Sequence, residues 1–178
     1  MKILILGGTT EASALATALA EREVPALFSY AGRVSTPKPQ PLPTRVGGFG
    51  GVAGLAAFLT EQRITHLVDA THPFAERMSR NAVAAASHSG IPLIALTRSP
   101  WVPQAEDRWE PVADIQAAVG ALAGPPQRIL LAIGRQQLAA FAAQPQHHYL
   151  LRLVDPPEAP PPLPRHHIVL DRGPFTLD

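Results

Sequence analysis

The sequence predicts an α/β fold built on parallel sheets. Short apolar segments of strand length alternate with alanine-rich segments of helical character over most of the 178 residues. Continuous apolar strands separated by helices are typical of parallel sheets whose two faces are both covered. The alternation lapses from Thr97 to Pro111 and then resumes, so we expect two domains, residues 1–98 and 99–178.

In the first domain, apolar runs of strand length and longer alanine-rich runs follow one another regularly. The predicted elements are strand Ile3 to Leu6, helix Glu11 to Arg22, strand Ala26 to Tyr30, helix Val52 to Gln62, strand Thr65 to Ala70, helix Ala75 to His88 and strand Leu93 to Leu96. Right-handed crossovers place the carboxyl ends of parallel strands at one edge of the sheet, where ligands of such folds bind.

The second domain has fewer predicted elements. They are helix Ala113 to Leu122, strand Arg128 to Ile133, helix Gln136 to Ala143, strand Tyr149 to Val154 and strand Ile168 to Leu170. With so few elements, we expect this α/β domain to be incomplete in this chain. Two proline-rich runs, Thr36 to Pro43 and Asp155 to Pro164, are predicted to be ordered loops or linkers, because proline does not pair inside a sheet. Recognition by a proline-binding module is the less favoured alternative.

Composition excludes several classes of protein. Hydrophobic residues make up 46% and charged residues 16%, which is a globular balance. The net charge of +1 gives no field that would attract nucleic acid or an anionic membrane. The absence of cysteine excludes disulfides and thiolate metal sites, and the adjacent histidine pairs, 147–148 and 166–167, are poor metal ligands because successive side chains of a strand point to opposite faces. Without an apolar run of membrane-spanning length, we expect a cytoplasmic protein; a monomer is compatible with the sequence.

A glycine turn links the first strand to the first helix. Gly7 and Gly8 are followed by Thr9, Thr10 and Glu11 at the start of the helix. Such a turn lets backbone approach a pyrophosphate closely, and the helix N-terminus supplies free N–H groups and a positive dipole. The motif is not a full G-x-G-x-x-G, so a plain turn with a threonine N-cap is the alternative.

Arg33 follows the second strand, where such folds contact the adenosine ribose. An arginine there suits the 2′-phosphate of NADP, because its planar fork binds phosphate oxygens two at a time. NADP is therefore favoured over NAD. The alternative is that Arg33 is a solvated surface charge.

Two further loops follow strand-like or extended segments. Gly47, Gly48 and Phe49 belong to a run with four glycines around one aromatic residue, which predicts either a close approach to a ligand or a flexible tip. Thr71 and His72 lie at the end of the third predicted strand, where a nicotinamide would arrive, with Pro73 predicted at the start of the next helix. Turn and capping chemistry is the alternative for this segment.

In the second half, Arg135 and Arg172 each follow a strand and are candidates to bind an anionic substrate in an interdomain cleft. Structural ion pairs are the alternative for both. His72 is a candidate proton donor, but the sequence assigns no catalytic acid.

Seven segments together resemble the precorrin-6A reductase family (CobK/CbiJ type) of cobalamin (vitamin B12) biosynthesis. They are ILILGGTTEASALA, SYAGR, RVGGFGG, DATHPFAERMSRNA, IPLIALTRSPW, LLAIGRQQLAAF and RGPF. The resemblance implies two Rossmann-like domains with NADPH between them. It places the cofactor at Gly7, Gly8, Thr9, Thr10, Glu11, Arg33, Gly47, Gly48, Phe49, Thr71, His72, Pro73 and Phe74.

The same resemblance implies an oxidoreductase that uses NADPH to reduce the C18=C19 double bond of precorrin-6A, giving precorrin-6B. Arg135 and Arg172 would then face the carboxylates of this tetrapyrrole-derived macrocycle. Family members continue beyond the RGPF segment, so the resemblance also implies a C-terminally shortened chain, which ends at Asp178. A non-enzymatic NADP(H)-binding regulator is the alternative function, because it explains the first half equally well.

Overall fold

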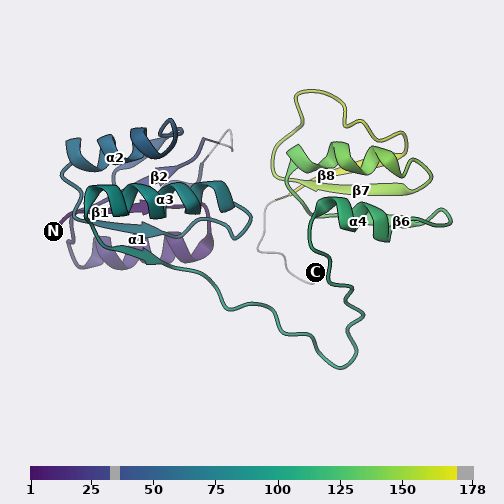
Figure 1. The fold of residues 1–178 in the computed structure, drawn as a ribbon, viewed down its shortest axis with the longest axis horizontal. Coiled ribbons are helices and arrows are strands. Elements are labelled where there is room, and N and C mark those ends of the chain that lie inside the picture. Colours follow the sequence, from purple (N-terminus) through teal and green to yellow (C-terminus); the bar gives the residue numbers. More distant parts are fainter. Residues whose placement is uncertain (33–36, 172–178) are drawn as a thin grey trace. The chain divides into compact units, whose positions relative to one another are not determined.

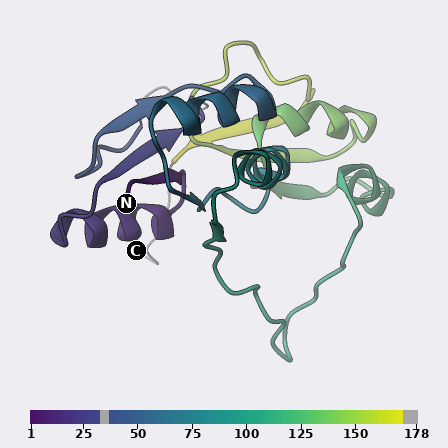
Figure 2. The same cartoon turned by 60° about the vertical axis from the view of Figure 1, so that its left-hand side comes forward.

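The computed structural model describes residues 1–32 and 37–171. It divides into two compact units, Met1–Trp101 and Val102–Asp178. Figure 1 shows both units, and Figure 2 shows them turned by 60°.

The first unit is a five-stranded, wholly parallel sheet with helices on both faces. Its strands are β1 (Ile3–Leu6), β2 (Ala26–Tyr30), β3 (Thr44–Val46), β4 (His66–Asp69) and β5 (Leu93–Ala95), in the order β3-β2-β1-β4-β5. Its helices are α1 (Thr10–Glu21), α2 (Gly51–Glu61) and α3 (Glu76–Ser89). The chain starts in the centre, builds outward through β2 and β3, and then crosses to β4 on the other side of β1.

Two apolar layers hold the helices against this sheet. On one face, Ala12 and Ala16 of α1 pack with Ile5 and Phe28. The other face carries α2 and α3, whose buried leucines and alanines pack on Leu4, Leu6 and Leu67 (Figure 1). Each fully buried leucine or phenylalanine contributes roughly 1.5–3 kcal/mol. The small alanines let helix and sheet backbones approach closely, which explains why the helical segments are so rich in this residue.

Strand β3 is an element that the sequence prediction missed. It has three residues, lies at the edge of the sheet and pairs with β2 in the register Phe28↔Thr44 and Ser29↔Arg45. Such a short edge strand with polar Thr44 and Arg45 has no apolar repeat that could reveal it. The strand forms because β2 offers an open row of hydrogen-bonding groups. The N–H of Phe28, for example, donates to the carbonyl of Pro43 at 2.8 Å.

The second unit is a smaller parallel sheet with helices. Its elements are α4 (Ile115–Ala121), β6 (Arg128–Leu131), the 3₁₀ helix η1 (Arg135–Ala143), β7 (His148–Leu153) and β8 (His166–Leu170), with strand order β6-β7-β8. Its core centres on the fully buried Tyr149, whose hydroxyl donates to the carbonyl of Gln144 at 2.8 Å. Burial raises the pKa of the Tyr149 phenol.

The predicted helix Gln136 to Ala143 is present, but as a 3₁₀ helix that begins at Arg135. Its ends close with i→i+3 bonds, from Gln137 N–H to the carbonyl of Gly134 and from Gln144 N–H to that of Phe141. Apolar spacing over nine residues does not separate this tighter helix from an α-helix. The predicted strand Arg128 to Ile133 is also too long, since β6 ends at Leu131.

Candidate functional site

The loops of the first unit meet at the carboxyl edge of its sheet. Backbone hydrogen bonds extend the strand register into these loops. They join Gly7 N–H to Ser29 O (2.9 Å), Ala70 N–H to Leu6 O (2.9 Å), Gly47 N–H to Tyr30 O (2.9 Å) and Leu96 N–H to Asp69 O (2.8 Å). The chain reverses its direction of growth between β1 and β4, and ligands of open parallel sheets bind outside the strand ends at such a reversal.

The two glycines of the first turn have different roles. A Cβ atom on Gly7 would overlap the ring of Phe28, which is fully buried on β2. Gly8 has a positive φ of 139°, which favours glycine, and no described atom lies within 4 Å of the place where its Cβ would be. Gly7 therefore serves packing, whereas Gly8 leaves an open backbone surface that fits the close approach of a phosphate group.

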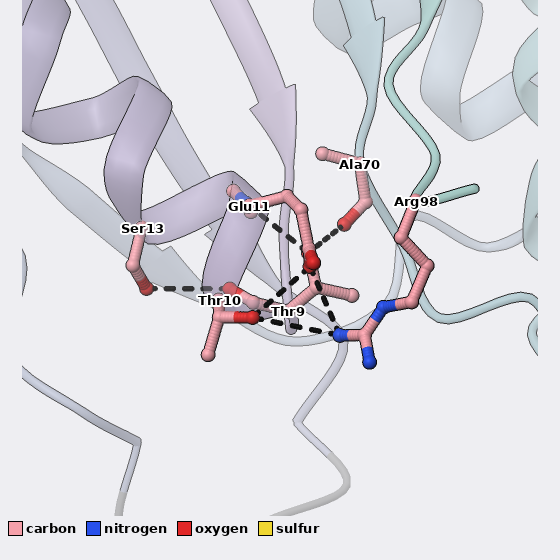
Figure 3. A network of polar contacts seen from close by, with 7 residues as sticks. Thr9, Thr10, Glu11, Ser13, Ala70 and Arg98 are labelled. Atoms are coloured by element: carbon pink, nitrogen blue, oxygen red, sulfur yellow. Dashed lines mark hydrogen bonds and ion pairs between the residues drawn. The ribbon is translucent and has the colours of Figure 1, made fainter. Parts of the chain in front are cut away.

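Thr9 closes the turn and starts α1. Its hydroxyl oxygen accepts a hydrogen bond from Ala12 N–H (3.1 Å), and the same hydroxyl donates to the carbonyl of Ala70 (2.9 Å) after β4 (Figure 3). The threonine N-cap that the sequence offered as an alternative is thus confirmed. The cap also ties the start of α1 to the end of β4, so it shapes the turn that a phosphate would enter.

Arg98 lies across the same turn and was missed as a site residue. Its guanidinium donates to the Glu11 carboxylate (3.1 Å), and Thr10 donates to that carboxylate as well (3.1 Å) (Figure 3). The pKa of Glu11 lies below its ordinary value, because its own backbone N–H, Arg98 and Thr10 all stabilise the charged form. The signal was available in the sequence, since Arg98 follows the last strand of the first unit within the TRSPW segment.

The loop after β3 is organised around Arg45. This side chain donates to Ser29 Oγ (2.8 Å), to the carbonyl of Gly47 (2.9 Å) and to that of Gly48 (3.2 Å). Its Cζ atom lies 4.0 Å from the centre of the Phe49 ring, which packs edge-on against Phe58 of α2. Phe49 therefore has a defined packing role in the structure.

The turn after β4 is held by Asp69, which is buried. Its Oδ1 accepts hydrogen bonds from both the backbone N–H (3.1 Å) and the hydroxyl (2.7 Å) of Thr71. Next, His72 Nδ1 accepts from Phe74 N–H (3.2 Å), and the two rings lie 5.0 Å apart. His72 is exposed, as is Phe74, at 76%.

Pro73 does not begin the following helix, contrary to the prediction. Helix α3 begins at Glu76, and Pro73 lies in a turn in which Ala75 N–H donates to the carbonyl of His72 (2.7 Å). Proline is favoured at the second position of such turns because its φ angle is preset. The local preference for proline is the same in both settings, so the sequence pattern did not separate them.

Three predicted site residues are not among those described at this edge. Arg33 and Arg172 fall outside the residues that the structure describes. Arg135, in the second unit, forms an exposed ion pair with Glu158 at 3.4 Å, the alternative that the sequence left open for it. The structure thus brings together the predicted cofactor residues of the first unit, apart from Arg33, along one sheet edge.

Within the described residues, no group of three or more histidine, aspartate or glutamate side chains could hold a metal ion. Among the described helices, none is long and apolar enough to cross a membrane.

Comparison with known proteins agrees with this architecture. A model of the family described as precorrin-6x reductase CbiJ/CobK matches residues 2–178. A precorrin-6A reductase of Rhodobacter capsulatus is 60% identical over 99% of this chain and 70% of its own length, and one from Sinorhizobium sp. is 51% identical over 98% and 67%. A solved structure named CobK precorrin-6A reductase superposes with a TM-score of 0.96 at 60% identity, over 99% of this chain and 70% of that one. The chain therefore belongs to the precorrin-6x reductase CbiJ/CobK family.

Proposed function

We propose that this chain reduces the C18=C19 double bond of precorrin-6A to give precorrin-6B, with NADPH as the reductant, in cobalamin biosynthesis. Family membership supports the reaction class. One structural observation supports the cofactor: the open Gly8 backbone and the capped start of α1 lie together at the reversal point of a parallel sheet. A pyrophosphate is the ligand that such a turn suits best.

The residues divide into four groups in this proposal. Gly7, Gly8, Thr9, Thr10 and Glu11 form the turn at the pyrophosphate. Arg33 and the glycine loop with Gly47, Gly48 and Phe49 bind the adenosine end. Thr71, His72, Pro73 and Phe74 lie beside the nicotinamide ring, and Arg135 and Arg172 anchor carboxylates of the macrocycle.

When bound, NADPH supplies a hydride to one carbon of the double bond, while the neighbouring carbon takes a proton. The chain contributes position, charge and exclusion of water around the reacting atoms. The exposed imidazole of His72, held by Phe74 N–H, is a candidate donor of that proton.

The first test is a titration of the chain with NADPH and with NADH, followed by nicotinamide fluorescence. We expect NADPH to bind at least about tenfold more tightly, a difference of about 1.4 kcal/mol. Arg33→Ala should weaken NADPH far more than NADH, whereas the exposed Arg22→Ala, at the far end of α1, should change neither. Equal losses of both nucleotides in Arg33→Ala would contradict the role of Arg33.

Turnover is tested separately by the absorption spectrum of precorrin-6A, which changes when one conjugated double bond is reduced. We expect the spectrum to change only when NADPH and the chain are both present. Tight binding of NADPH without any change in the macrocycle would favour the regulator over the enzyme.

A further inference from the structure

We infer that Arg45 is a positioning residue that holds the glycine loop of residues 47–51 in the shape that binds the nucleotide. This inference rests on the proposed function, because it concerns how the same site is kept in place. Arg45 itself contacts protein groups, and its effect on the nucleotide is expected to pass through the loop.

The guanidinium connects two elements that the chain does not join directly. Its Nη1 donates both to Ser29 Oγ at the end of β2 and to the carbonyl of Gly47, while Nη2 donates to the carbonyl of Gly48. Ser29 is buried, at 3% exposure. A planar fork with several fixed N–H groups can serve three acceptors in this way, whereas a lysine ammonium on a flexible stem is a single point charge.

Packing fixes the guanidinium in place. It stacks on Phe49 at 4.0 Å and lies 5.1 Å from the centre of the Phe58 ring on α2. A Cβ on Gly54 of α2 would overlap the carbonyl oxygen of Phe49, so the loop lies directly on the helix at this point. Partial burial of the Arg45 side chain lowers the pKa of its guanidinium below the ordinary value.

The loop needs such a support because its glycines have no side chains that could hold its conformation. Gly47, Gly50 and Gly51 have φ angles of 125°, 79° and 91°, and glycine loses more conformational freedom on ordering than any other residue. No described atom lies within 4 Å of a Cβ placed on Gly48 or Gly50, so these positions are open to a ligand. If the loop is already ordered before the nucleotide binds, no binding free energy is lost in ordering the loop, and the affinity is higher.

The test compares Arg45→Ala, Arg45→Lys and the exposed control Arg22→Ala with the unchanged chain. The dissociation constants of NADPH and NADH are measured by nicotinamide fluorescence, at a temperature where circular dichroism shows each variant to be folded. We expect Arg45→Ala to weaken both nucleotides by about tenfold with their ratio unchanged, Arg45→Lys to restore little, and Arg22→Ala to change nothing.

Hydrogen exchange without nucleotide supplies a second readout. We expect faster exchange confined to residues 47–51 in Arg45→Ala, a change that general destabilisation of the sheet would not produce. Ser29→Ala, which removes one of the three acceptors, should show a smaller effect of the same kind. It also keeps the inference testable if Arg45→Ala does not fold.

Several results would overturn this role. They are unchanged affinities in Arg45→Ala, full restoration by Arg45→Lys, or a loss restricted to NADPH, which would assign Arg45 to the 2′-phosphate directly. If the unchanged chain binds neither nucleotide, the proposed cofactor falls and this inference falls with it. If it binds NADPH and only the Arg45 results fail, the proposed function stands.

Discussion

Gly7 shows how one missing side chain can serve the core of a protein beside a ligand site. The turn after β1 passes directly over Phe28, a fully buried ring on β2 that also contacts Tyr30. Protein cores are packed as densely as organic crystals, so even one added methyl group has no room there. The glycine is therefore required whether or not a nucleotide is bound.

We expect Gly7→Ala to lower the free energy of unfolding by about 2 kcal/mol, because overpacking forces the ring or the turn to move. Urea unfolding measures this value. Gly120→Ala, inside α4 with open space around its Cβ, is the matched control and should raise stability by up to about 1 kcal/mol, because alanine favours a helix over glycine. If Gly7→Ala has the same free energy of unfolding as the unchanged chain, the turn can accept a methyl group beside Phe28, and the packing role of Gly7 is wrong. Adding Phe28→Leu should recover part of the loss.

Glu11 concentrates negative charge at the start of α1. Its carboxylate is held by its own backbone N–H, by Arg98 and by Thr10, and its pKa is therefore lowered from 4.5. Because the folded chain holds this proton less tightly than the unfolded chain, the stabilisation is complete above about pH 4.5 and is lost as the pH falls through the lower folded value.

The corresponding measurement is the free energy of unfolding against pH for the unchanged chain and for Glu11→Gln. We expect the difference between them to be constant well above pH 4.5 and to shrink below it. Arg98→Gln should remove only part of the effect, because the backbone N–H of Glu11 is the largest cause of the shift. Parallel curves for the unchanged chain and Glu11→Gln over the whole range would contradict this account.

The start of helix α1 depends on one hydroxyl group. Thr9 caps the helix through Ala12 N–H and also reaches the carbonyl of Ala70. The same hydroxyl makes the helix cap and the link to β4, so a substitution that removes it removes both. The helix that covers one face of the sheet is therefore attached to the sheet at the candidate site.

We expect Thr9→Ala to destabilise the chain by about 2 kcal/mol, since loss of an N-cap costs about 0.5–2 kcal/mol and the bond to Ala70 is lost as well. Thr9→Ser keeps the hydroxyl and should restore most of this, as measured by thermal or urea unfolding. Equal losses in both variants would attribute the effect to the methyl group of Thr9.

In the chain as a whole, a long connection separates the two units. Residues 96–114 contain neither helix nor strand (Figures 1 and 2). Residues 101–110 are all exposed. A structureless segment of this length is uncommon within a compact domain and is a preferred site of proteolysis.

Limited digestion with trypsin should therefore cut first after Arg108, giving fragments 1–108 and 109–178 that mass spectrometry identifies. Arg108→Gln should abolish this cut and leave the others unchanged. An earlier cut within α3, for example after Arg77, would show that the helices open more readily than the connection.

The fold of the first unit was largely predictable because its signals are local. Strands β1 and β2 have the predicted bounds, and the helices begin and end within one residue of the prediction. Apolar runs, helical periodicity, the glycine turn and its threonine cap are all recognisable from residues that are consecutive or nearly so in the chain. The candidate site followed from the same signals, because parallel strands place their following loops at one edge.

The remainder depends on contacts between residues that are far apart in the chain. Arg98 reaches Glu11 across 87 positions, Arg45 joins the end of β2 to the glycine loop, and Phe28 lies beneath Gly7. Strand β3 exists because β2 has a free edge to pair with. Sheet order and register decide which side chains meet, and they are properties of the assembled sheet that no short window of sequence contains.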